Sequence, residues 1–227
     1  MKNIWIILTL LPIFGLYNCA PSRFVEPLDK GEVSVGAHLG GPVIDFGAPI
    51  PMPITAIELG YGLDSNLTLH GAWHTTAAIF GNFQIDAGVT FKLLNQNKYR
   101  PNISVNPGFN FIYDFNDKAA KFWPTVDLNA YWNYGQRRSY FYIGFNNYFE
   151  LSKTKANDQT QTDHWIFNPQ IGHIWKTKSD KWEIITELKF LAPYKDNSYA
   201  FIPYTSLTGK NGANGFYLGV RYKLGKN

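Results

Sequence analysis

The sequence predicts an all-β protein: a closed, antiparallel, up-and-down β-barrel of about ten strands (roughly eight to twelve) that spans a membrane. Apolar and polar residues alternate along most of the chain, and short and long connections take turns between the alternating segments. Aromatic residues make up 17% of the chain and charged residues only 17%, against about 25% charged residues in ordinary soluble domains. We therefore expect much of the surface to face something other than water.

The first 18 residues have the pattern of a signal peptide. Lys2 supplies a positive charge, residues 4–16 form an apolar run, and Leu16 stands three residues before Cys19. This pattern resembles the lipobox of bacterial lipoproteins, which implies that Cys19 becomes the acylated first residue after cleavage. The alternative is an ordinary signal peptide with an incidental cysteine. Cys19 is the only cysteine, so an internal disulfide is excluded.

The predicted organisation has one folded domain. Residues 1–18 form the signal peptide, residues 19–30 the lipid anchor and a short tether, and residues 31–227 the barrel. Two-residue alternation is clearest between Phe83 and Leu93. The ten predicted strands cover residues 32–40, 55–64, 66–79, 83–93, 103–115, 125–134, 140–150, 165–176, 182–191 and 215–224.

The connections support the barrel, because outer-membrane barrels join strands by short periplasmic turns and longer external loops. Most links follow this rule, although the short link at residues 80–82 breaks it. The expected long links cover residues 41–54, 116–123, 152–164 and 192–214. Ten strands would place both ends of the mature chain on the periplasmic side, with a lipid on Cys19 in the inner leaflet beside the barrel.

Alternation alone does not say which face of the sheet meets lipid. The polar positions hold mainly Gly, Ser, Thr, Asn and isolated charges, a composition that suits a crowded lumen better than a water-facing surface. Aromatic residues gather at strand ends, as interfacial girdles require: Trp175 and Trp182 beside short links, Trp123 and Trp165 beside long ones. The apolar face is therefore expected to point outward.

Residues 60–69 have a strand, tight turn and strand that resemble the periplasmic hairpins of small bacterial outer-membrane β-barrel proteins. The resemblance extends in pattern over about residues 30–225. It implies a location in the outer membrane. The chain departs from such barrels at its C-terminus, where Tyr222 is followed by five further residues instead of ending the chain.

Charges of both signs fall on the predicted inner face. The candidate lumen charges are Glu58, Asp86, Asp127, Glu187 and Arg221. Glu187 and Arg221 lie on consecutive strands and are expected to pair with each other. A barrel of about ten strands has room mostly for side chains, so a mixed-sign lumen favours a salt-bridged plug over an open channel.

The sequence predicts no catalytic residue, cofactor or metal site. His38, His70 and His74 fall on the inner face, but His70 and His74 would stand about 13 Å apart along a strand, too far to bind one metal together. No Gly-x-Ser-x-Gly motif is present. The net charge of +4 is small and dispersed, which argues against nucleic acid as a partner.

We therefore predict a non-catalytic outer-membrane β-barrel lipoprotein, acting as a structural or accessory subunit of a cell-envelope assembly. Its expected partners are outer-membrane lipid and other envelope proteins, reached through the external loops or the barrel wall. One alternative is a small pore or binder for a minor solute. Another is a lipid-modifying enzyme, either an acyl hydrolase or an acyl transferase.

Replacement of Cys19 tests the lipoprotein signal directly. Cys19→Ala should abolish incorporation of a labelled fatty acid, because the thiol that carries the acyl group is lost. Metabolic labelling of the full chain in outer membranes measures this. Equal labelling of both chains would rule out acylation at Cys19.

Overall fold

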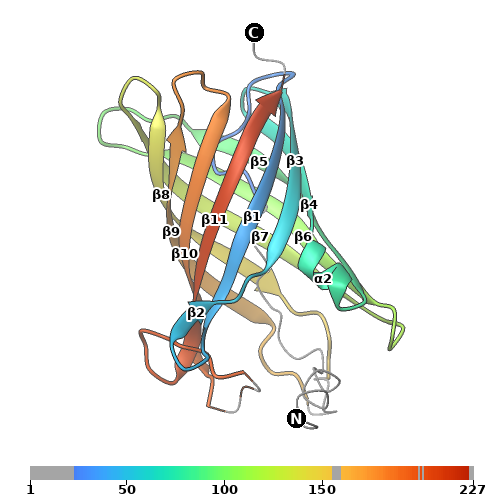
Figure 1. The fold of residues 1–227 in the computed structure, drawn as a ribbon. Helices are drawn as coiled ribbons and strands as arrows, with labels where there is room; N and C mark the ends of the chain where they lie inside the picture. The colour runs from blue at the N-terminus through green and yellow to red at the C-terminus, as the bar shows by residue number, and fades with distance from the viewer. Residues whose placement is uncertain (1–22, 155–159, 199, 201, 225–227) are drawn as a thin grey trace.

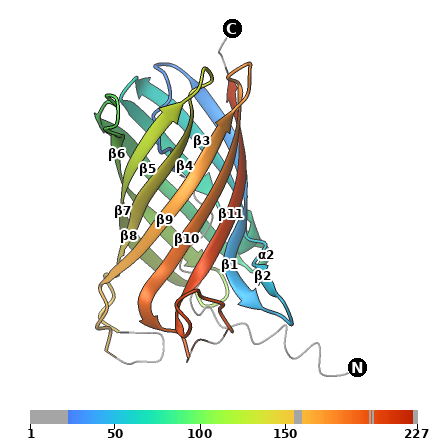
Figure 2. The same cartoon turned by 90° about the vertical axis from the view of Figure 1, so that its left-hand side faces the viewer.

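The computed structural model describes residues 23–154, 160–198, 200 and 202–224. One antiparallel sheet contains every strand of these ranges, and it rolls into a closed barrel (Figures 1 and 2). The elements are β1 (Val33–Asp45), β2 (Pro49–Pro51), β3 (Thr55–Asp64), β4 (Leu67–Trp73), α2 (Thr75–Ile79), β5 (Asn82–Leu94), β6 (Asn102–Asp114), β7 (Ala119–Tyr134), β8 (Ser139–Phe149), β9 (Trp165–Lys176), β10 (Trp182–Asp196) and β11 (Asn211–Leu224).

The barrel closes where the first and last strands meet. Each long strand pairs with its neighbours along the chain, and β1 also pairs with β11, so that Val35 lies opposite Tyr222 on one side and Leu59 on the other. The three-residue β2 only extends the end of β1, and the remaining ten strands form the closed ring. This confirms the predicted all-β, up-and-down barrel.

The two faces of the wall have opposite chemistry. Large apolar side chains point outward and are exposed, among them Leu59 (58%), Ile143 (49%) and Ile184 (50%). The inward positions hold polar side chains, and Glu58 and Asn168 are fully buried. A closed barrel with an apolar exterior and a polar interior is the arrangement that spans an outer membrane, because every strand pairs and no backbone group is left open to hydrocarbon.

The two ends of the barrel differ. β11 finishes at one end of the barrel, which we call the short-turn end. β1 begins at this end, and the turns β3–β4, β7–β8 and β9–β10 lie there. The opposite end, which we call the loop end, carries β2, α2 and the connection between β10 and β11 (Figure 1). There the Asp45 amide donates to the Pro203 carbonyl at 2.9 Å, and the Thr205 amide donates to the Val43 carbonyl at 2.8 Å. The last connection thus packs on the extension of β1.

Several predicted boundaries are wrong at the loop end, where β1 and β10 continue past residues 40 and 191 to Asp45 and Asp196 and so shorten the expected long links. The strand expected over residues 66–79 stops at Trp73, and α2 follows, because alternation is lost where Thr75, Thr76 and two alanines stand in succession. The link that was expected at residues 80–82 is therefore longer than predicted and contains a helix. This helix is short, and no helix in the described ranges is long and apolar enough to cross a membrane. The link expected over residues 116–123 shrinks instead to 115–118, since β7 begins at Ala119 and pairs with the end of β6.

Ile143→Lys should destabilise the barrel in lipid by about 2–4 kcal/mol, because a lysine at mid-wall must be buried in hydrocarbon. Equilibrium unfolding by denaturant in lipid vesicles measures the change. Leu207→Lys is the control, since Leu207 lies in the β10–β11 connection and is 76% exposed. A change for Ile143→Lys no larger than that of the control would mean that this face meets water.

Candidate functional site: the lumen and its N-terminal plug

Residues 23–28 lie inside the barrel and residues 29–31 lie at its short-turn rim, and we call residues 23–31 the plug segment. The chain crosses the rim at the short-turn end, where the Gly31 amide donates to the Gly62 carbonyl at 2.7 Å and the Gly62 amide donates to the Glu32 carbonyl at 2.9 Å. From there the segment runs inward to Arg23. The sequence predicted a lipid anchor and a short tether over residues 19–30. Residues 23–28 of that stretch are in the lumen, and Cys19 lies outside the described residues.

Hydroxyl groups of the wall hold the backbone of the plug segment. These side chains come from β4, β5 and β6, which follow one another around the ring. The bonds are Thr68 Oγ1 accepting from the Leu28 amide at 2.8 Å, Thr90 Oγ1 donating to the Phe24 carbonyl at 2.8 Å, and Ser104 Oγ donating to the Val25 carbonyl at 2.7 Å. The plug segment therefore has a defined path along the wall.

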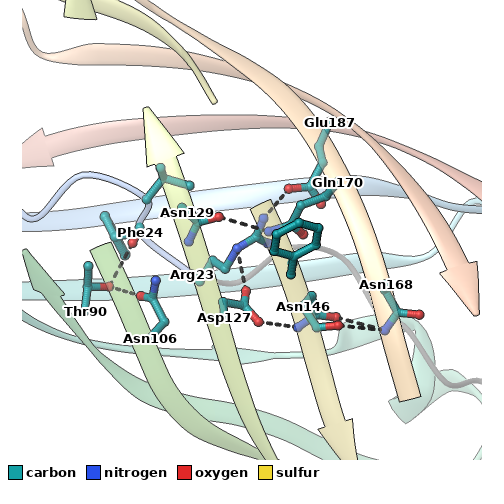
Figure 3. Close-up of polar contacts among 12 residues, drawn as sticks. Arg23, Phe24, Thr90, Asn106, Asp127, Asn129, Asn146, Asn168, Gln170 and Glu187 are labelled. Carbon is teal, nitrogen blue, oxygen red and sulfur yellow. Dashed lines mark hydrogen bonds and ion pairs between the residues drawn. The ribbon is translucent and has the colours of Figure 1, made fainter. Parts of the chain in front are cut away.

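Arg23 is the charged centre of the lumen. Its Nε lies 2.6 Å from Asp127 Oδ2 on β7, and its Nη2 pairs with Glu187 on β10 (Figure 3). The Tyr142 hydroxyl donates to the same Glu187 carboxylate at 2.6 Å. Arg23 is only 7% exposed, and a buried charge is tolerated only when it is paired and hydrogen-bonded. Removing either side of this contact would leave the other buried without its partner.

Arg221 forms a second ion pair beside the first. Its guanidinium pairs with Glu58, donates to the Arg23 carbonyl at 2.7 Å, and stacks 4.0 Å from the centre of the Phe24 ring. Glu58 also lies 2.8 Å from His38 Nε2. Arg221 thus binds a wall carboxylate and the plug segment at once.

The expected pair between Glu187 and Arg221 is wrong. The register of β10 and β11 places Arg221 opposite Glu183 and Glu187 opposite Tyr217. Arg221 Nη1 accordingly lies 3.7 Å from Glu183 Oε2. The sequence predicted which strands are neighbours but not the register between them, and the register decides which charged side chains meet.

In the short-turn half of the lumen, apolar and aromatic side chains pack around Val25. Its side chain belongs to a buried cluster with Tyr131, Tyr140, Tyr142, Ile174 and Ile185. Nearer the rim, Lys176 Nζ lies 2.5 Å from Glu26 Oε2 in the plug segment. Lys223 Nζ lies 3.1 Å from Glu183 Oε1 and 3.9 Å from Glu32 Oε2. The plug segment therefore supplies apolar packing as well as charges.

The loop half of the lumen is lined by side-chain amides. Gln84 donates to the Asn110 side-chain oxygen at 3.2 Å in this half. Nearer the centre, Gln170 donates to the Asn129 side-chain oxygen at 3.0 Å, a contact drawn in Figure 3. Further bonds in this half join Asn146 to Asp127, Asn168 to Asn146, Asn110 to Asp86, and His74 to Asp86. The five predicted lumen charges are therefore all inside the barrel, and Asp86 belongs to this amide-lined half.

The three histidines that the sequence predicted on the inner face do not lie together. His38 contacts Glu58, His74 lies 2.7 Å from Asp86, and His70 stands beside the ring of Phe24 at 6.0 Å between centroids. Within the described ranges, no group of three His, Cys, Asp or Glu side chains is placed to hold a metal ion.

Trp123 and Glu150 close the rim at the loop end. Trp123 was expected in an outward girdle, but its indole is 8% exposed and donates to Glu150 Oε2 at 2.8 Å. Glu150 lies just beyond β8, and its other oxygen accepts from the Ser152 amide at 2.8 Å. Burial acts to raise the pKa of Glu150, but the hydrogen bonds from Ser152 and Trp123 outweigh it and hold the pKa below its usual value. The rim carboxylate is therefore charged at neutral pH.

Two glycines of β3 make room for the plug segment. A Cβ on Gly60 would lie 2.4 Å from Cζ of Phe24, and one on Gly62 would lie 2.0 Å from the carbonyl oxygen of Asp29. Real Cβ atoms do not approach other atoms this closely, so the wall at these positions requires glycine. The shape of the wall is thus complementary to the plug segment.

Gly62→Ala should lower barrel stability by about 1–3 kcal/mol, because the new methyl group must displace the plug segment or the strand. The temperature at which the folded band converts on a gel measures this. Gly71→Ala on β4 is the control, since its nearest atom, a backbone oxygen of Asp86, would be 3.1 Å away and the plug segment is not involved. Equal shifts for the two variants would contradict a wall fitted to the plug segment.

No protein-family model and no curated protein matches the sequence. Several solved structures resemble the fold. The NanC porin is 12% identical, with 85% of this chain and 99% of that chain covered and a TM-score of 0.45. An outer membrane channel from Pseudomonas putida F1 is 11% identical (89% and 98% covered, TM-score 0.47), and the outer membrane protein OprG from Pseudomonas aeruginosa is 10% identical (89% and 100% covered, TM-score 0.33). At these identities and TM-scores, the likenesses assign no function to this chain.

Proposed function

We propose that the protein is a small-solute pore of the outer membrane that its own plug segment closes at rest. The observation that carries this proposal is the way the lumen is filled. The central contacts join wall to plug segment, through Arg23 on one side and Asp127 and Glu187 on the other. The described part of the obstruction is therefore a segment that continues into β1 at the short-turn end, and its ion pairs are contacts that water can replace.

The wall is already suited to water once the plug segment withdraws. The inward positions of the loop half are amides and carboxylates. The hydroxyls of Thr90 and Ser104 donate to carbonyls of the plug segment, and water would replace these carbonyls as acceptors after the segment withdraws. A lumen of about ten strands is narrow, so only small solutes would pass. We place this reading above the structural or accessory barrel that the sequence favoured.

The lipid-modifying alternative finds less support. The two histidine–carboxylate contacts, His38 with Glu58 and His74 with Asp86, are inside the lumen. Neither contact therefore faces the lipid at the outer surface of the wall.

Arg23→Ala should raise the fraction of time that the barrel conducts by at least about tenfold, because loss of one partner of a buried ion pair costs roughly 3–5 kcal/mol. Single-channel recording in planar bilayers, with the full chain, measures this. Arg100→Ala is the matched control, since Arg100 is exposed at the short-turn end. An Arg23→Ala barrel that folds but remains as silent as the control would reject the pore and favour an accessory barrel.

A further inference from the structure

We propose that Asp127 and Glu187 form a guanidinium-binding site, that Arg23 occupies it when the barrel is closed, and that the solutes admitted are guanidinium-bearing cations such as arginine and short arginine-containing peptides. The transport part of this inference rests on the proposed pore. The binding part does not, because it concerns only what the site holds when Arg23 is absent.

The geometry of the site matches a guanidinium group. Arg23 Nε lies 2.6 Å from Asp127 Oδ2, and Arg23 Nη2 is hydrogen-bonded to Glu187; the two carboxylates come from β7 and β10. A planar group with several donors reaches both carboxylates at one time, whereas the ammonium of lysine is a compact point charge. The site therefore distinguishes the shape of the cation as well as its sign.

The wall fixes both carboxylates without help from the plug segment. The Asn146 amide donates to Asp127, and the Tyr142 hydroxyl donates to Glu187 at 2.6 Å. Asp127 is 4% exposed and Glu187 is 1% exposed. Carboxylates held in this way keep their positions when the cation leaves, so the empty site is preorganised for another.

Charge balance gives the site room for one monovalent cation. Lys189 Nζ lies 3.6 Å from Glu187 Oε1 and compensates part of the negative charge. Arg221 is engaged by Glu58 and, at 3.7 Å, by Glu183. Without Arg23, Asp127 keeps the hydrogen bond from the neutral Asn146 amide and the Coulombic attraction of Lys189, which Asp127 shares with Glu187. A buried carboxylate in this state favours capture of a cation.

The rest of the plug segment shows how a peptide could occupy the same place. The carbonyls of Arg23, Phe24 and Val25 accept from Arg221, Thr90 and Ser104 in turn. These hydrogen bonds are made to backbone carbonyls, so they do not depend on which side chains the segment carries. An arginine residue with one or two neighbours would therefore find the same donors, which is why short arginine peptides are included in the proposed class.

The test uses the full chain carrying Arg23→Ala, with L-argininamide as the probe and L-lysinamide as the control of equal charge. Argininamide should raise the unfolding temperature of Arg23→Ala, with a half-maximal concentration at least about tenfold lower than that of lysinamide, because it can bridge both carboxylates. Arg23→Ala combined with Asp127→Asn should lose this preference. The wild type and Arg100→Ala should show none, since Arg23 fills their site.

Equal effects of the two amides on Arg23→Ala, or an unchanged preference in the double variant, would overturn the site. If Arg23→Ala does not fold, Arg23→Gln supplies the same measurement with a longer neutral side chain in the lumen. Selective binding by a barrel that never conducts would uphold the site and reject the pore. Conduction without selective binding would reject the site and uphold the pore.

Discussion

Closure of the sheet by the pairing of β1 with β11 is the constraint on which the rest of the molecule depends. In hydrocarbon an open sheet edge would leave a row of amides and carbonyls without partners, each at a cost of several kcal/mol. Because the ring is closed, apolar side chains can face lipid on one side of every strand. The same closure sends every second side chain into a narrow lumen.

That lumen then has to satisfy its own polar groups. A polar or charged side chain taken from water must find a partner, and a narrow barrel leaves little space for water to supply one. In the loop half, side-chain amides such as Gln84 and Asn110 bond one another, whereas the centre depends on Arg23 and the short-turn half on Val25 and Glu26. The plug segment is thus part of the interior, and Gly60 and Gly62 shape the wall around it.

The way the plug segment is held differs from the way the wall is held. The wall consists of continuous backbone ladders between strands, while the plug segment is bound mainly by ion pairs, side-chain hydroxyls and one apolar cluster. Ladders in hydrocarbon have no substitute partner, but water or a solute can replace an ion pair inside the lumen. This difference is the physical basis for our proposal that the plug segment moves while the barrel remains intact.

The sequence by itself determined the barrel, its outward face and most of its strands, because a period of two is a local property that survives in every strand. It also identified Glu58, Asp86, Asp127, Glu187 and Arg221 as lumen charges. It did not identify Arg23 as a site residue, since residues 19–30 carry no strand-like alternation and were predicted only as a lipid anchor and a short tether. Only the tertiary structure decided which charges meet. Register is set by contacts between separate strands, such as Glu183 opposite Arg221. The path of the plug segment is set by contacts between residues far apart in the sequence, such as Arg23 and Glu187, and local patterns record neither.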